Sequence, residues 1–208
     1  MALFITFEGG EGSGKSVQAR ALYRRLSRSD IPALLTHEPG GTPCGNRIGR
    51  WLKWTEVKDI SPLTELLLFN ASRAQLVSEV IRPNLKKGVV VICDRYTDST
   101  IAYQSYGRGL DLAVIKVINN AATQGLKPDL VVLLDIPAAE GLARKRVEKQ
   151  DRFEQEDITF HQRVREGYLK LAANDPQRWL MVDASQSKAK IREIIWQRVR
   201  QLLSKQGD

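Results

Sequence analysis

The sequence predicts an α/β fold in which a doubly wound sheet of five parallel strands is flanked by helices. Three observations lead to this prediction. Short apolar runs recur along the chain, segments with helical spacing of apolar residues separate them, and the first run passes into a glycine-rich turn that opens a helix. The strands are expected at residues 3–7, 31–35, 89–93, 130–135 and 179–182.

The turn after the first strand contains Gly9-x-x-x-x-Gly14-Lys15-Ser16, the spacing of a phosphate-binding loop. Glycines let the backbone wrap closely around phosphates, and the helix expected at residues 17–29 offers its positive end. Lys15 would reach the outer phosphates, and the Ser16 hydroxyl would ligate Mg²⁺. The alternative is a glycine-rich turn that matches by accident, but the motif lies between a strand and a helix, as the function requires. The sequence therefore predicts a nucleotide site of the P-loop NTPase type, formed by Gly9, Gly10, Glu11, Gly12, Ser13, Gly14, Lys15 and Ser16.

The second strand closes a β-α-β unit and brings residues 36–42 to the edge of the sheet where ligands bind in this architecture. A short helix is expected at 48–53. A long or broken helix is expected over 63–85, beginning after Ser61-Pro62 with Ser61 as its cap. Within it, Phe69 and Arg73 are four residues apart and share a face. Core packing is the simpler explanation for Phe69, but an arginine on an apolar face needs a polar or anionic partner.

The third strand is a continuous apolar run, typical of a central parallel strand, and it ends at Asp94-Arg95-Tyr96. A carboxylate at the tip of a second strand is the usual partner of a phosphate-binding loop in holding Mg²⁺, although Asp94 could equally cap a helix. Arg95 has the planar fork that binds phosphate. A helix is expected over residues 99–104.

Further helices are expected at 112–122, 138–146, 160–173 and 191–203, around the fourth and fifth strands. The segment 144–152 is polar and basic and lacks an apolar face. It is either a solvated helix end or a lid, over about residues 144–154, that closes arginines over phosphates.

Composition narrows the class of protein. The 208 residues are 42% hydrophobic and 27% charged, which predicts one soluble domain spanning 1–208. We find neither a signal peptide nor an apolar run of the ~20 residues that cross a membrane. Cys44 and Cys93 are too few for a disulfide framework, so a cytoplasmic location with reduced thiols is expected. The net charge of +8 indicates polyanionic partners, either nucleic acid or a phosphate-rich site.

Five stretches together, residues 7–16, 38–42, 69–73, 94–96 and 151–152, resemble the thymidylate kinase family over nearly the whole chain. The resemblance implies an ATP- and Mg²⁺-dependent nucleoside monophosphate kinase that phosphorylates dTMP to dTDP in dTTP synthesis. Its partners would be ATP and dTMP, with no nucleic acid and no membrane, and it would be a homodimer.

The resemblance also implies roles for individual residues. Phe69 would stack on thymine, Arg73 would hydrogen-bond a base carbonyl, and Tyr103 would exclude ribonucleotides. The implied dTMP-binding set is Glu11, Glu38, Arg50, Phe69, Arg73, Arg95, Thr100, Tyr103 and Gln104; Ser16 and Asp94 would hold Mg²⁺. The implied catalytic set is Lys15, Arg95, Arg144, Arg146 and Arg152, because the phosphate loop has no arginine and the lid has several, as in the bacterial type.

The chain departs from the family pattern at two positions near the substrate phosphate. His37 and Gly49 stand where family members often have arginine, and Arg50 is our candidate for the missing contact.

Two alternatives remain open from the residues. One is a kinase for another nucleoside or nucleotide on the same scaffold, and the other is a nucleic-acid-associated P-loop ATPase. A GTP switch is disfavoured because the chain has no Asn-Lys-x-Asp segment.

Overall fold

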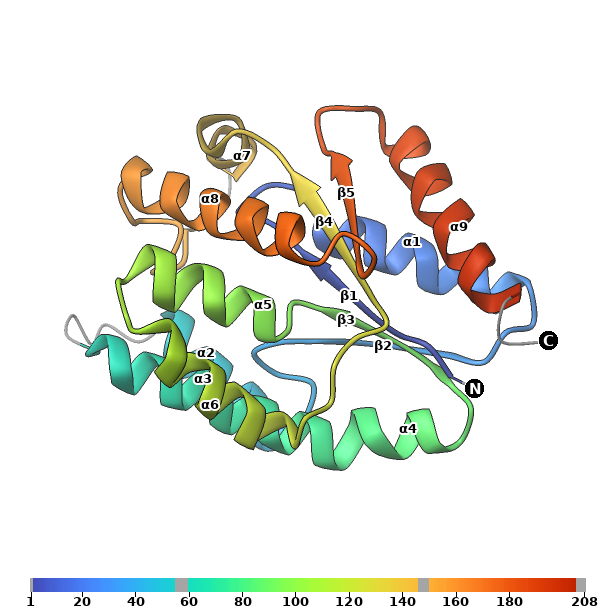
Figure 1. The fold of residues 1–208 in the computed structure, drawn as a ribbon, viewed down its shortest axis with the longest axis horizontal. Helices are drawn as coiled ribbons and strands as arrows, with labels where there is room; N and C mark the ends of the chain where they lie inside the picture. The colour runs from blue at the N-terminus through green and yellow to red at the C-terminus, as the bar shows by residue number, and fades with distance from the viewer. Residues whose placement is uncertain (1, 55–59, 146–149, 205–208) are drawn as a thin grey trace.

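The computed structural model describes residues 2–54, 60–145 and 150–204 and contains a five-stranded sheet. The strand order is β2-β3-β1-β4-β5, and every neighbouring pair is parallel (Figure 1). This confirms the predicted fold class. The strands are β1 Phe4–Glu8, β2 Ala33–His37, β3 Val90–Asp94, β4 Leu130–Asp135 and β5 Trp179–Asp183.

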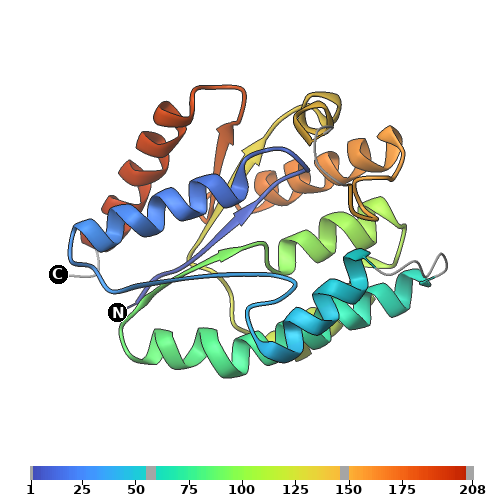
Figure 2. The ribbon, with the colours of Figure 1, turned by 180° about the vertical axis from the view of Figure 1, so that it is seen from behind.

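Helices cover both faces of the sheet. On one face lie α1 (Lys15–Arg28) and α9 (Lys188–Ser204), side by side in Figure 2. On the other lie α3 (Pro62–Leu76), η1 (Val77–Ile81), α4 (Arg82–Lys86), α5 (Thr97–Thr100), η2 (Ile101–Gly107) and α8 (Ile158–Asn174). The remaining helices are α2 (Pro43–Trp54), α6 (Leu112–Thr123) and α7 (Ala138–Lys145).

The core explains why the strands read as continuous apolar runs. In β1, Ile5 and Phe7 pack with residues of α1 and α9, while Phe4 packs on the opposite side with residues of α3 and η1. Central strands β3 and β4 alternate in the same way, so both faces of each strand are buried.

The helix predicted over 63–85 is one helical run in three parts, because α3, η1 and α4 follow each other without a break. Ser61 caps it as predicted, accepting a hydrogen bond from the Thr64 N–H at 3.2 Å. The π-helical segment η1 lies just before Arg82 and Pro83. Proline cannot donate to the helical ladder and its ring crowds the preceding turn, which accounts for the wider turn at this point.

Several predicted boundaries shift for local reasons. The second strand begins at Ala33, since Pro32 has no N–H to give to the sheet. The short helix expected at 48–53 begins at Pro43, whose fixed φ suits a first turn. The helix expected at 160–173 begins at Ile158, because the Asp157 carboxylate caps it.

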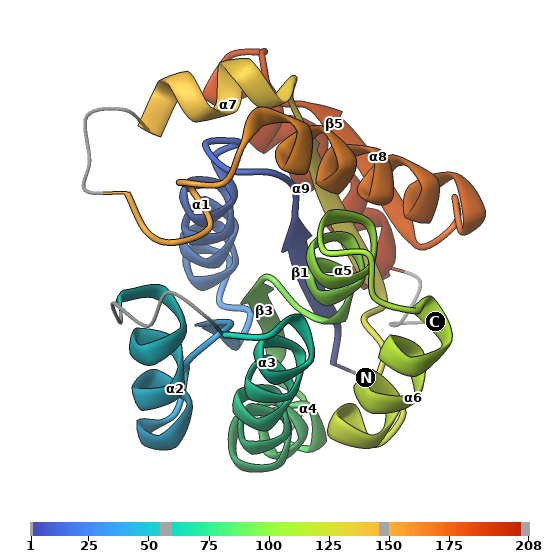
Figure 3. The same ribbon diagram turned by 90° about the vertical axis from the view of Figure 1, so that its left-hand side faces the viewer.

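The carboxyl ends of the strands meet the loops that carry the predicted site. Figure 3 shows the segment before α8 (orange) descending beside the end of α2. Of the predicted lid, Arg146 lies outside the described residues. Over the part of the chain that the structure describes, every helix is too short or too polar to span a bilayer.

Candidate active site

The phosphate loop is held by close contact between two backbones. Gly12 has φ +67°, and a Cβ there would overlap the carbonyl oxygen of Gly141 in α7. A Cβ on Gly141 would in turn overlap the carbonyl oxygen of Glu11. Both positions therefore require glycine. Sequence reasoning missed Gly141, because a lone glycine inside a helical pattern does not indicate which segment packs against it.

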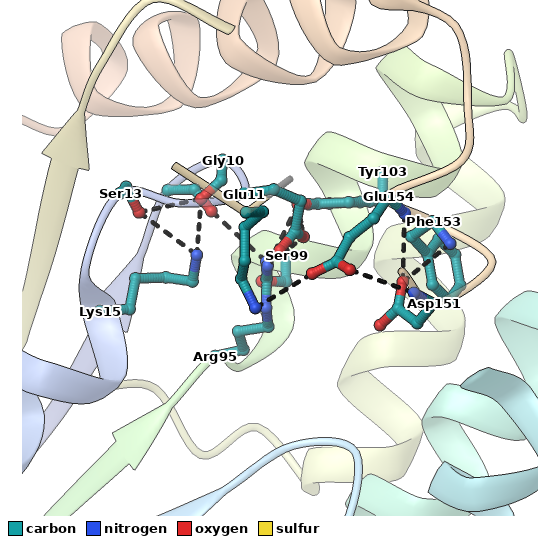
Figure 4. A network of polar contacts seen from close by, with 12 residues as sticks. Gly10, Glu11, Ser13, Lys15, Arg95, Ser99, Tyr103, Asp151, Phe153 and Glu154 are labelled. Carbon is teal, nitrogen blue, oxygen red and sulfur yellow. Dashed lines mark hydrogen bonds and ion pairs between the residues drawn. The ribbon is translucent and has the colours of Figure 1, made fainter. Parts of the chain in front are cut away.

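Lys15 lies inside the loop, and its Nζ donates to the Gly10 carbonyl at 2.7 Å and to Ser13 Oγ at 3.3 Å (Figure 4). Burial, together with the nearby positive charge of Arg95, lowers the pKa of Lys15 to about 8.

Ser16 and Asp94 meet as predicted, because the Ser16 hydroxyl donates to the Asp94 carboxylate. Both side chains offer oxygen ligands, which suit Mg²⁺. Among the described residues there is no cluster of three or more His, Cys, Asp or Glu side chains that could hold a metal. This donor set fits an ion that takes its other ligands from water and nucleotide phosphates.

Arg95 occupies the centre of the site. Its Nη2 pairs with Glu11 Oε1 at 2.5 Å, and the Tyr103 hydroxyl donates to the same oxygen at 2.6 Å (Figure 4). Burial would raise the pKa of Glu11, but the charges of Arg95 and Lys15 outweigh it and hold that pKa well below its usual range. Arg95 itself has φ +72°, a left-handed conformation that is costly for a residue with a side chain. The surrounding contacts thus hold the guanidinium at this junction.

Glu8 in β1 binds residues that surround Arg95, and it was not assigned a role from the sequence. Its carboxylate accepts hydrogen bonds from the Tyr96 N–H (2.8 Å), Ser99 Oγ (2.6 Å) and the Tyr168 hydroxyl (3.0 Å). Burial, with the adjacent charge of Asp98, raises the pKa of Glu8 to about 8. The side chain connects β1 to α5 and α8 beneath Arg95.

Arg73 is buried and tightly held. Its Nε donates to Glu38 Oε2 at 2.8 Å, Nη1 donates to Asn119 (2.7 Å) and Asn70 (3.3 Å), and Nη2 donates to the Tyr96 carbonyl at 3.1 Å. Nη2 also pairs with Glu38 at 2.7 Å. A direct hydrogen bond to a base therefore has to share or replace one of these partners.

The predicted lid arginines have separate partners. Arg144 Nη1 donates to the Ala184 carbonyl at 3.1 Å and lines the cleft. Arg152 instead pairs with Glu65 at 2.7 Å and donates to the Leu52 carbonyl at 3.2 Å, so it joins the lid to α2 and α3. It is not part of the cleft lining.

The structure also explains the glycine at position 49, where family members often have arginine. A Cβ on Gly49 would lie 2.9 Å from the Pro39 carbonyl oxygen, so α2 packs directly on the backbone there. Arg50 is exposed and does not line the cleft, whereas Lys53 does. Lys53 was given no role from the sequence, although it lies within the helix predicted at 48–53.

One cleft of about 1210 Å³ joins the two predicted pockets. Gly9, Gly10, Arg50 and Arg152 lie outside its lining. The predicted residues that it brings together are Glu11, Gly12, Ser13, Gly14, Lys15, Ser16, Glu38, Phe69, Arg73, Asp94, Arg95, Thr100, Tyr103, Gln104 and Arg144.

A triphosphate loop that faces a second pocket containing an arginine and an aromatic ring defines a class of protein. This arrangement positions two nucleotides in one cleft, as nucleoside monophosphate kinases of the P-loop type require.

Comparisons with known proteins agree with this class. The family model described as thymidylate kinase matches residues 7–195. The chain is 56% identical over 203 residues to a thymidylate kinase of Dehalococcoides mccartyi, covering 98% of each chain. It is 52% identical over 200 residues to one of a Roseiflexus species, covering 90% of this chain and 88% of the relative. The crystal structure of thymidylate kinase from Ehrlichia chaffeensis matches with a TM-score of 0.78 and 31% identity, covering 95% of this chain and 98% of that one.

The chain therefore belongs to the thymidylate kinase family. The predicted family and enzyme class, an ATP-dependent nucleoside monophosphate kinase, are confirmed, and the comparisons do not favour either alternative.

Proposed function

We propose that this protein transfers the γ-phosphoryl group of ATP to dTMP, with Mg²⁺, and produces dTDP for dTTP synthesis. The observation that carries this proposal is the single cleft, in which Lys15 and Arg95 line the junction between the phosphate loop and the pocket of Phe69 and Arg73.

At the donor end, the loop N–H groups and Lys15 bind the ATP phosphates. Lys15 exchanges its bonds to Gly10 and Ser13 for phosphate oxygens. Ser16 and Asp94 would hold Mg²⁺, which would neutralise negative charge on the phosphates during transfer. The first turn of α1 and the end of β3 thereby fix the direction in which the transferring group points.

At the acceptor end, Arg95 binds the phosphate of dTMP and places its attacking oxygen toward the donor. Phe69 stacks on the base, and its ring already packs 5.7 Å from that of Phe153. Arg73, Thr100 and Gln104 lie around the base edge, while the ring of Tyr103 blocks a ribose 2′-hydroxyl. Glu11 faces the sugar, and Glu38 holds Arg73.

The lid completes charge neutralisation. We assign Arg144 to the transferring phosphoryl group, because it lines the cleft beside the nucleotide loop. Arg152 acts at a distance by docking the lid on Glu65, and Arg146 lies outside the described residues. An arginine at the transferring group is worth on the order of 10³–10⁵ in rate.

We also propose a cytoplasmic, single-domain homodimer. Exposed apolar side chains on α3 and α6 support an interface there: Leu63, Leu67, Val114 and Val117. Leu66 and Leu76, in contrast, belong to the core. Light scattering of the wild type and of Leu67→Asp tests this assembly: the variant should be monomeric, and a monomeric wild type would refute it.

The function is tested with a substrate panel. Purified protein is given ATP, Mg²⁺ and each of dTMP, UMP, CMP and AMP, and dTMP should have the highest kcat/KM. Equal or better turnover of another monophosphate would overturn the substrate assignment. Lys15→Ala should remain folded and lose nearly all turnover with every substrate.

A further inference from the structure

Glu65 in α3 is buried beside the base pocket, and so far it has been described only as the partner of Arg152. The residue is fully buried, with a relative exposure of 0%. Its carboxylate accepts a hydrogen bond from Gln104 Nε2 at 2.8 Å and pairs with Arg152 (2.7 Å) and Arg108 (3.3 Å). The two guanidinium groups give the buried carboxylate opposite charges and hydrogen-bond donors, which compensates for its loss of water.

These contacts determine how the Gln104 amide is turned. The Glu65 carboxylate accepts from two guanidinium groups and from the Gln104 NH₂ group, so this NH₂ group faces Glu65. Gln104 also lines the cleft, and no described residue donates to its Oε1. The carbonyl oxygen is therefore the amide atom that is left for a ligand.

The direction of this amide matters for the choice of base. Thymine and uracil carry a proton on N3 and can donate it to a carbonyl oxygen, whereas cytosine has an unprotonated N3 that only accepts. A fixed acceptor in the pocket therefore matches the first two bases and leaves two acceptors opposed in the third. Such mismatches at buried polar groups discriminate strongly.

We propose that Glu65 is a positioning residue for base selection: it holds the Gln104 amide with its carbonyl oxygen toward the base and so selects pyrimidines with an N3–H. This inference rests on the proposed function, because it assumes that the base of the monophosphate lies beside Gln104.

The primary test is Glu65→Gln, which keeps the shape but can donate as well as accept, so that the Gln104 amide is free to turn. We expect the ratio of kcat/KM for dTMP over dCMP to fall by about tenfold or more. The ratio for dTMP over dUMP should stay unchanged, since both bases present the same N3–H. An unchanged dTMP/dCMP ratio would overturn the proposal.

Arg108→Gln is the matched control. It removes the ion pair between Arg108 and Glu65 but keeps the Glu65 carboxylate and its pair with Arg152, so the dTMP/dCMP ratio should hold even if stability drops. Double variants with Gln104→Ala separate positioning from general damage. In that background Glu65→Gln should have no further effect on the ratio, whereas a merely structural role would give the same added loss for all three substrates.

A measurement on the wild type keeps the test valid if Glu65→Gln does not fold. Hydrogen exchange of the Gln104 side-chain NH₂, followed by NMR, should be slow without ligand and remain slow with dTMP. Fast exchange that becomes slow only on adding dTMP would place the NH₂ toward the base and refute the proposal. A wild type that does not prefer dTMP over dCMP would instead contradict the proposed function.

Discussion

Gly141→Ala is a substitution for which helix propensity and tertiary contact predict opposite results. Gly141 lies inside α7, outside every motif that points to the site. On propensity alone, alanine should stabilise an interior helical position by about 0.5–1 kcal/mol. In the structure, however, the new Cβ would overlap the carbonyl oxygen of Glu11 in the phosphate loop. We expect the steric overlap to outweigh the gain in helix propensity, so that the substitution destabilises the protein.

The size of the effect follows from the atoms involved. The obstacle is backbone on both sides, so no flexible side chain can move away. Restoring normal contact requires α7 and the loop to separate by on the order of 1 Å, and overpacking of this kind costs about 1–3 kcal/mol. A displacement of about 1 Å at a catalytic loop lowers turnover by about 10²-fold.

The assay combines thermal unfolding, ATP affinity by calorimetry and steady-state turnover. Gly141→Ala should lower the Tm, weaken ATP binding and reduce kcat. Ala143→Gly, an exposed position of the same helix, changes propensity without touching the loop and should leave the Kd of ATP unchanged. A Gly141→Ala protein with a raised Tm and normal turnover would refute the reasoning.

Three further predictions follow from single contacts. Because the pKa of Lys15 is about 8, its positive charge is lost as pH rises through that value. Calorimetry should therefore show the Kd of ATP increasing about tenfold per pH unit above 8, and a constant Kd from pH 7 to 9.5 would contradict this. Tyr103→Phe removes the 2.6 Å hydrogen bond to Glu11 and should raise the KM for dTMP about tenfold, with the Kd of ATP unchanged. The retained ring should preserve discrimination against UMP. Steady-state kinetics with both monophosphates tests this, and an unchanged KM for dTMP with improved turnover of UMP would contradict it. Arg73→Ala leaves the buried Glu38 carboxylate unpaired, so denaturant unfolding should show the free energy of unfolding reduced by about 3–5 kcal/mol. Binding of dTMP should weaken while binding of ATP stays intact; equal losses of affinity for both ligands would make Arg73 purely structural.

The fold was predictable from sequence because its signals are local. The strand β4 was predicted with its observed bounds, since a six-residue apolar run between turn residues leaves little ambiguity. The errors in the prediction lie at the ends of helices and strands, where a single residue determines the boundary. Pro32 delays the second strand, and Pro43 starts the short helix early.

The site residues that belong to recognisable sequence motifs could be predicted from the sequence. Lys15 lies at the end of the loop that follows β1, and Asp94 and Arg95 lie at the end of β3. Because β1 and β3 are parallel neighbours, their carboxyl ends meet at one edge of the sheet. The role of Gly141 depends on how α7 crosses the loop, and the attachment of Arg152 depends on a carboxylate far away in the sequence. Such contacts between distant segments leave no periodicity or spacing to read.

The ion pair between Glu11 and Arg95 has a consequence for how substrate and product exchange. Without a monophosphate the guanidinium already has an anionic occupant. If Arg95 binds the monophosphate as proposed, an incoming phosphate replaces one anion with another, and the binding affinity reflects only the difference between the two pairings. When the product departs, the carboxylate returns, so the emptied pocket never carries an unbalanced positive charge that would retain the nucleotide.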